Sequence, residues 1–152
     1  MPKVYVSKAV SVAEQMRAIQ AGLEWINWHQ LISPGARVFI KPNLSTYPIY
    51  TPGVTTSPEF LEALVVALND RTENITIGES DGGRHAWTAD DAFRGHNLSE
   101  IALKHGVNVV NLSHEPWESI QTQVNGKFVK VDLPSLLLHD VDVFITVPVP
   151  KL

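Results

Sequence analysis

The sequence has 152 residues and a formal net charge of −4, with 12 Lys and Arg against 16 Asp and Glu. This length fits one domain, and 44% hydrophobic with 18% charged residues is typical of an ordinary globular protein. The basic residues are few and scattered, which argues against the basic footprint of a nucleic-acid binder. No stretch approaches the ~20 apolar residues that cross a bilayer, and no signal peptide is visible. We therefore expect a soluble cytoplasmic domain with neither nucleic acid nor a membrane as its partner.

The chain contains no cysteine. Disulfides, a thiolate nucleophile, a cysteine-ligated zinc site and a cysteine-ligated iron–sulfur cluster are therefore excluded within this sequence. The sequence points to no other cofactor, so the cofactor stays unknown at this stage.

The first elements are a strand and a helix. Val4–Val10 alternates and is rich in β-branched residues, which predicts a strand. Ser11 and Glu14 then have the spacing of a capping box, and apolar residues follow at helical intervals. We expect this helix to end near Leu31, because residues 33–35 (Ser-Pro-Gly) break helices strongly.

A buried strand and a long loop come next. Arg37–Lys41 is a short apolar run closed by a proline, which favours a strand buried on both faces. Residues 42–53 form a loop long enough to be functional. A second helix begins at residues 56–59, with either Ser57 or Thr56 as its N-cap.

The rest of the chain continues the alternation of strands and helices. Three further strands are expected at Asn74–Gly78, Val107–Leu112 and Val141–Val147. Helical segments are expected at Asp90–Phe93, Ser99–His105 and Leu133–His139. Gln121–Val131 predicts a β-hairpin, because Asn125-Gly126 is the two-residue turn typical of type I′.

This order predicts an α/β fold with a mostly parallel sheet, helices on both faces and an antiparallel hairpin around Asn125-Gly126. In such sheets ligands bind beyond the carboxyl ends of the strands. Three polar segments follow strand ends, namely residues 41–43 (Lys-Pro-Asn), 79–81 (Glu-Ser-Asp) and 148–151 (Pro-Val-Pro-Lys). If the strands are parallel, these three segments meet at one edge of the sheet.

Lys41 and Asn43 are the first candidates for ligand binding. A lysine at the end of a buried strand is a cation on a rigid element, and Asn43 adds a hydrogen-bond donor and an acceptor. Together with Lys151 they suit a carboxylate or a phosphate. The alternative interpretation is that Lys41 only extends out of the core toward water while the proline ends the strand.

Thr55 and Thr56 place hydroxyl groups at the start of the second helix, where free amides and the helix dipole favour anions. Plain helix capping is the alternative, and it needs only one hydroxyl. Neither the Walker phosphate loop nor the GxGxxG pattern occurs, so nucleotide binding lacks support.

Glu79, Ser80 and Asp81 offer two carboxylates and a hydroxyl after a strand. Glu79 and Asp81 are the candidates for acid–base catalysis or metal coordination, and Ser80 for ligand binding. A solvated acidic turn is the alternative, and we assign no metal site. Surface or cap roles are expected for the histidines His96, His105, His114 and His139, which show no ligand spacing. Packing or an oligomer contact is expected for Trp25 and Trp28.

Four motifs together resemble one family, catalogued as domain of unknown function 362. The motifs are residues 38–44 (Val-Phe-Ile-Lys-Pro-Asn-Leu), 55–59 (Thr-Thr-Ser-Pro-Glu), 77–80 (Ile-Gly-Glu-Ser) and 140–148 (Asp-Val-Asp-Val-Phe-Ile-Thr-Val-Pro). The resemblance extends from about Val4 to Leu152. It implies an α/β domain that is sometimes joined to a ferredoxin-like iron–sulfur module, and it brings no general activity with it.

The last motif of that family continues lysine-leucine-lysine-threonine-histidine after the proline. Here Pro150-Lys151-Leu152 matches only its start. The resemblance therefore implies that residues 1–152 are a single α/β domain, incomplete at its C-terminus.

The sequence predicts an uncharacterised α/β domain that binds a small anionic ligand at loops after parallel strands, and that is an enzyme if Glu79 or Asp81 acts on the ligand. The alternative is a non-catalytic binding or assembly domain, either a homo-oligomer or a partner of an iron–sulfur redox protein.

Overall fold

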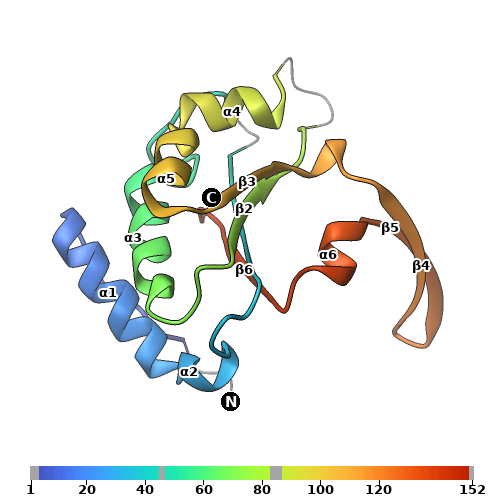
Figure 1. The fold of residues 1–152 in the computed structure, drawn as a ribbon, viewed down its shortest axis with the longest axis horizontal. Coiled ribbons are helices and arrows are strands. Elements are labelled where there is room, and N and C mark those ends of the chain that lie inside the picture. The colour runs from blue at the N-terminus through green and yellow to red at the C-terminus, as the bar shows by residue number, and fades with distance from the viewer. Residues whose placement is uncertain (1–3, 45–46, 83–86, 151–152) are drawn as a thin grey trace.

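Short runs rich in Val and Ile form a four-stranded parallel sheet at the centre of the protein. The computed structural model describes residues 4–44, 47–82 and 87–150. Across the sheet the strands lie in the order β3-β2-β1-β6 (Figure 1). Their bounds are β1 Val38–Pro42, β2 Ile75–Glu79, β3 Asn108–Asn111 and β6 Val143–Val147. The parallel order confirms the predicted sheet.

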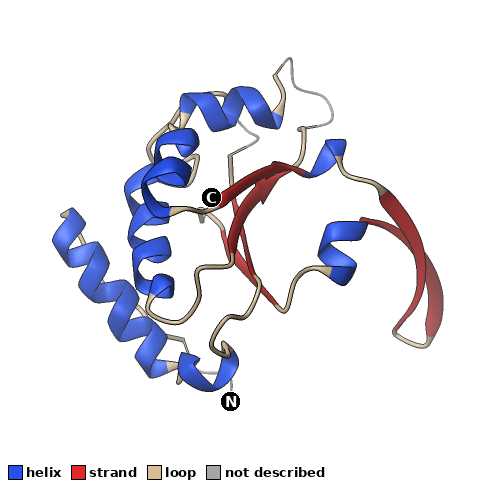
Figure 2. Cartoon of the chain, viewed as in Figure 1, coloured by secondary structure: helices blue, strands red, loops and turns tan. Residues whose placement is uncertain are grey.

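Helices connect the strands and flank the sheet on both sides. They are α1 Val12–Trp25, α2 Trp28–Leu31, α3 Pro58–Asn69, α4 Ala89–Gly95, α5 Leu98–His105 and α6 Ser135–His139. A single 3₁₀ turn, η1, spans Leu112–His114. In Figure 2, α1, α3 and α5 lie on one side of the strands, while α6 lies on the other side. Within the described ranges, no helix combines the length and the apolar character needed to cross a bilayer.

The main core lies between the sheet and α3. Alternate residues of β1, such as Val38 and Ile40, face α3, because side chains of a strand point to opposite faces in turn. On α3, Leu61, Val65 and Leu68 are fully buried and recur at helical spacing. This contact explains why the second helix forms where the sequence predicts it.

The opposite face of the sheet is only partly covered. There Phe39 is completely buried and stacks on Phe144, with 5.4 Å between ring centroids. The neighbouring strand carries Gly78 at this point, where an added Cβ would lie 2.3 Å from the Phe39 ring. A glycine is therefore required beneath the Phe39 ring. Phe144 itself remains 46% exposed.

The β4–β5 hairpin forms a second, two-stranded sheet. β4 spans Trp117–Val124 and β5 spans Lys127–Pro134, so the hairpin is longer than the predicted Gln121–Val131. Asn125 and Gly126 have φ of 49° and 78°, as a type I′ turn requires. Figure 1 shows the hairpin extending away from the central sheet.

The helix caps agree with the sequence signals. The side chain of Ser11 accepts a hydrogen bond from the Glu14 amide, and the capping box is complete. At α3 the cap is Ser57, which decides between the two alternatives left open by the sequence. Thr56 has a different role, described below.

Two of the predicted elements are wrong. Residues 4–10 form no strand, although their pattern favours one, because their backbone pairs with none of the described strands. The first helix ends at Trp25 rather than near Leu31, because Asn27 adopts the left-handed conformation at φ 57°. A separate short helix, α2, then follows.

An ion pair between Arg37 and Asp142 joins the starts of β1 and β6. The guanidinium group of Arg37 donates to both carboxylate oxygens of Asp142, at 2.8 and 3.1 Å. The backbone amide of Arg37 donates to the same carboxylate at 2.8 Å. These hydrogen bonds lower the pKa of Asp142 from 3.8 to about 2.

Candidate functional site

The carboxyl ends of β1, β2 and β6 lie together at one edge of the sheet. Because these strands are parallel and β1 lies between the other two, the segments that follow them emerge side by side. Lys41 of β1 is opposite Thr146 of β6 in the strand register. The segments after Lys41, Glu79 and Val147 are thus brought to one edge, as the sequence predicts for a parallel sheet. Lys151 lies outside the described residues.

Lys41 and Glu79 form the central charged pair of this edge. The Lys41 Nζ atom donates to the Glu79 carboxylate at 2.8 Å. The Glu79 side chain is 3% exposed, whereas the Lys41 side chain is 38% exposed. The backbone amide of Ser80 also donates to Glu79, at 2.9 Å. A buried carboxylate thus holds the ammonium group of a partly exposed lysine at the end of a strand.

A hollow of about 370 Å³ opens beside this ammonium group. The residues that line it, here called the Lys41 hollow, are Lys41, Pro42, Asn43, Thr146, Pro148 and Val149. Among these side chains the cation of Lys41 is the only charge. The sequence interpretation missed Thr146, although its place just before the end of the last strand was a usable signal.

Asn43 and Thr56 brace the loop rather than point freely toward a ligand. Asn43 Nδ2 donates to the Val54 carbonyl oxygen at 2.7 Å, and its backbone amide donates to the Thr56 hydroxyl at 2.8 Å. The same hydroxyl donates to the Val147 carbonyl oxygen at 2.8 Å. These bonds tie the ends of β1 and β6 to the start of α3.

Thr55 belongs to a second, buried group with His96. The His96 ring is fully buried; its Nδ1 lies 2.8 Å from the Ala92 carbonyl oxygen and its Nε2 lies 3.0 Å from the Thr55 hydroxyl. A carbonyl oxygen only accepts, so Nδ1 carries the proton and Nε2 accepts from Thr55. Burial lowers the pKa of His96, which favours this neutral form.

The position of His96 corrects part of its sequence interpretation. It is the C-cap of α4, as one predicted role requires, but it does not lie on the surface. A single histidine after a glycine gives no signal of burial, so only the packing of α4 against the 47–56 loop reveals it. Tyr50 from that loop approaches the buried ring edge-on, with 6.3 Å between centroids.

Asp81 anchors the loop after β2. Its Oδ1 atom accepts from the Ala89 amide at 2.8 Å and from Asn111 Nδ2 at 3.0 Å. The backbone amide of Asp81 donates to the Ser113 hydroxyl at 2.9 Å. The Asp81 carboxylate therefore links α4 to the end of β3. Ser80 is half-buried next to it.

The carboxylates and histidines of the site do not gather around one point. Over residues 4–44, 47–82 and 87–150, no three His, Asp or Glu side chains come together as metal ligands would. The arrangement instead offers the Lys41 hollow, with the cation of Lys41 and the hydroxyl group of Thr146 in its lining.

The fold and this edge define a parallel α/β domain with a polar hollow beyond the strand ends. Residues 38–152 match the family model described as a domain of unknown function (DUF362), and the chain belongs to that family. Neither a curated protein nor a solved structure matches the chain.

Proposed function

We propose that this protein binds a small anion, either a carboxylate or a phosphate, in the Lys41 hollow. One observation carries the proposal. The Lys41 ammonium group is held by the buried Glu79 at 2.8 Å, yet 38% of its side chain stays exposed beside the hollow. A cation fixed on a strand end needs little ordering when a ligand arrives.

The ammonium group has a donor available for such a ligand. It carries three N–H donors, and the two oxygens of Glu79 engage the side facing the core. The third contact, to the Pro42 carbonyl oxygen, is long at 3.4 Å. An anion in the hollow replaces this long contact with a shorter hydrogen bond between two oppositely charged groups.

The start of α3 contributes less to this proposal than the sequence suggests. Ser57 caps the Phe60 amide at 3.1 Å, and the carboxylate of Glu59 lies in the first turn. That negative charge disfavours an anion at the helix end. Thr55 and Thr56 are 2% and 3% exposed, so the proposal assigns them to shaping the loop and Lys41 to contacting the ligand.

Glu79 is the better of the two candidates for acid–base chemistry. It contacts Lys41 directly, whereas Asp81 Oδ1 already accepts two hydrogen bonds from the protein. A catalytic role for either carboxylate stays a prediction.

Calorimetric titration of the full chain with inorganic phosphate, and then with small mono- and dicarboxylates, tests the proposal. Lys41→Met should weaken binding by about tenfold or more, because a hydrogen bond to a charged group contributes about 1.5–3 kcal/mol. The control Lys127→Met removes an exposed lysine of the hairpin and should leave binding unchanged. Equal anion binding by wild type and Lys41→Met would refute the proposal.

A further inference from the structure

The outer strand β6 has an unpaired edge. Among the described strands it pairs only with β1 and ends the order β3-β2-β1-β6. The Val143 amide donates toward β1, to the Arg37 carbonyl oxygen at 3.2 Å. Because backbone groups alternate in direction along a strand, those of Phe144 and Thr146 point away from β1. These two residues therefore present hydrogen-bonding groups to whatever lies beyond the sheet.

The sequence of β6 lacks the residues that normally protect an edge strand. Proteins usually guard exposed edges with charged residues, prolines, bulges or a covering segment. The five residues of β6 are Val-Phe-Ile-Thr-Val, with no charge, no proline and a strong preference for strands. Phe144, whose side chain lies on the face of the sheet that carries Phe39, is 46% exposed. An edge of this kind favours pairing with another strand.

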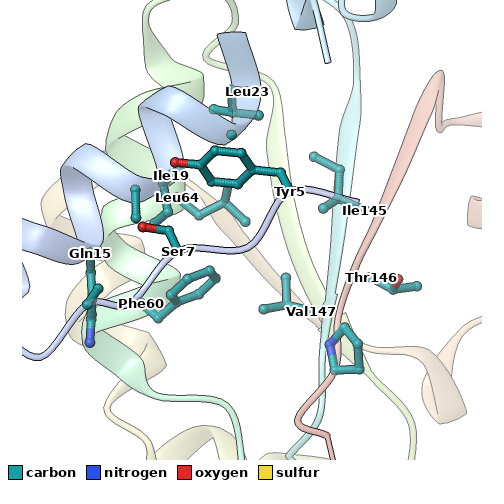
Figure 3. A pocket seen from close by; sticks show the side chains of 14 residues that line it. Tyr5, Ser7, Gln15, Ile19, Leu23, Phe60, Leu64, Ile145, Thr146 and Val147 are labelled. Carbon is teal, nitrogen blue, oxygen red and sulfur yellow. The ribbon is translucent and has the colours of Figure 1, made fainter. Parts of the chain in front are cut away.

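A cleft of about 580 Å³ runs along β6 on the side that faces the helices. Its walls are β6, the inner faces of α1 and α3, and residues 4–10. Figure 3 shows Tyr5 of the N-terminal segment near Ile145 of β6, and Ser7 nearer to Phe60 of α3. This cleft, here called the β6 cleft, is distinct from the Lys41 hollow, although Thr146 and Pro148 line both.

The lining of the β6 cleft is uncharged throughout. The residues are Tyr5, Ser7, Ala9, Gln15, Ala18, Ile19, Gly22, Leu23, Phe60, Leu64, Ile145, Thr146, Val147 and Pro148. The nearby charged residues Lys8, Glu14 and Arg17 are not among them. A chain of net charge −4 thus has a cleft that offers no ion pair to an occupant. Desolvating a charge there would be costly, so the cleft selects an uncharged occupant.

The opposite wall of the cleft is fixed on α1. An added Cβ at Gly22 would lie 3.3 Å from the Tyr5 ring, so Tyr5 sits closely on the helix at its smallest residue. The same ring lies 6.0 Å from that of Trp25. Residues 4–10 have the sequence pattern of a strand but pair with none of the described strands. The cleft is thus bordered by the free edge of β6 on one side and by a segment outside the described sheets on the other.

We infer that the β6 cleft binds an extended, uncharged peptide segment of another protein, which adds to the sheet as a strand beside β6. Backbone hydrogen bonds with Phe144 and Thr146 provide the affinity, and alternate small or aliphatic side chains of the segment fill the cleft against α1 and α3. An incoming strand lies ~4.8 Å from its neighbour, so a single extended chain is the partner whose shape and charge suit this space.

Amide hydrogen exchange in the ¹⁵N-labelled full chain tests this inference. The probe is the neutral peptide acetyl-Thr-Val-Thr-Val-Thr-Val-Thr-amide, added to millimolar concentration. In the free protein the amides of Phe144 and Thr146 should exchange quickly, while that of Ile145, directed at β1, exchanges slowly. The peptide should slow exchange at Phe144 and Thr146 at least tenfold and leave Ile145 unchanged. A peptide with aspartate in place of the valines should have no effect.

A matched pair of variants on α1 places the binding in the cleft. Ala18→Glu introduces a charge at a lining residue and should abolish the effect of the peptide. Ala21→Glu introduces the same charge on the exposed side of the same helix and should preserve it. Lys41→Met should also preserve it, which separates this inference from anion binding in the Lys41 hollow.

Three results would overturn the inference. The first is unchanged exchange at Phe144 and Thr146 at the highest peptide concentration. The second is protection of both amides in the free protein together with dimerisation in sedimentation equilibrium, which would make a second copy of this chain the occupant. The third is slowed exchange with a small apolar molecule such as 1-decanol but not with the peptide.

Discussion

Removing the charge of Lys41 should destabilise the protein, and removing the charge of Glu79 as well should restore part of the loss. The perturbations are Lys41→Met, Glu79→Gln and the double variant. In the single Lys41→Met variant the carboxylate of Glu79, 3% exposed, loses the ammonium group at 2.8 Å and keeps the Ser80 amide. A buried charge left without its counter-ion is the source of the expected cost.

The magnitude follows from the burial of the two partners. Breaking a fully buried ion pair costs about 3–5 kcal/mol. Lys41 is 38% exposed, so water already screens the pair and the lower end applies. We expect Lys41→Met to lower the free energy of unfolding by about 2–3 kcal/mol. Glu79→Gln should lower it by about 1 kcal/mol, because the Lys41 ammonium group can then be solvated by water. The double variant should lose about 1–2 kcal/mol less than the sum of the two.

Urea unfolding followed by circular dichroism measures these differences, with Lys127→Met in the exposed hairpin as the control. For a domain of this size each 1 kcal/mol lowers Tm by about 2–4 °C, so calorimetry provides an independent readout. Additive effects of the two substitutions, within about 0.3 kcal/mol, would show that the pair is not energetically coupled. The account of Lys41 as a cation held by Glu79 would then be wrong.

Two further predictions concern stability away from the site. Arginine hydrogen bonds lower the pKa of Asp142 from 3.8 to about 2, so its stabilising contribution is present above 3.8 and is lost as the pH falls through 2. In urea unfolding, the gap in stability between wild type and Asp142→Asn should therefore narrow over this range; a constant gap would contradict the assignment. At Gly95 an added Cβ would lie 1.7 Å from the Pro48 carbonyl oxygen, so Gly95→Ala should cost about 3 kcal/mol or more. Gly22→Ala, where the contact is a side chain at 3.3 Å, is the control and should cost much less; equal unfolding midpoints for the two variants would refute this reasoning.

Local signals in the sequence were sufficient where neighbouring residues decide the structure. The capping box of α1, the Ser57 cap with its following proline and the Asn125-Gly126 turn each depend on contacts within a few residues. The sequence patterns also placed Lys41 and Glu79 at the ends of strands that were expected to be parallel, which is why the segments after them could be expected at one edge. These features were predictable because the spacing of hydrophobic residues, helix capping and turn formation depend on residues close together in the sequence.

Contacts between distant segments were decided by the tertiary structure. The burial of His96 depends on a threonine 41 residues away in the sequence, and no local pattern announces it. Residues 4–10 show that a local pattern can also mislead. Their pattern favours a strand, but a strand forms only where the backbone of a neighbouring strand is available for hydrogen bonds.

The sequence by itself thus determined the α/β class, the mostly parallel orientation of the strands and the strand end that carries Lys41. Only the tertiary structure decided that Glu79 would be the buried partner of Lys41, that Thr56 would brace two strand ends, and that β6 would be left with an open edge. The physical reason is that hydrophobic periodicity selects which face of each element is buried, whereas pairing and exposure depend on which elements come together in space.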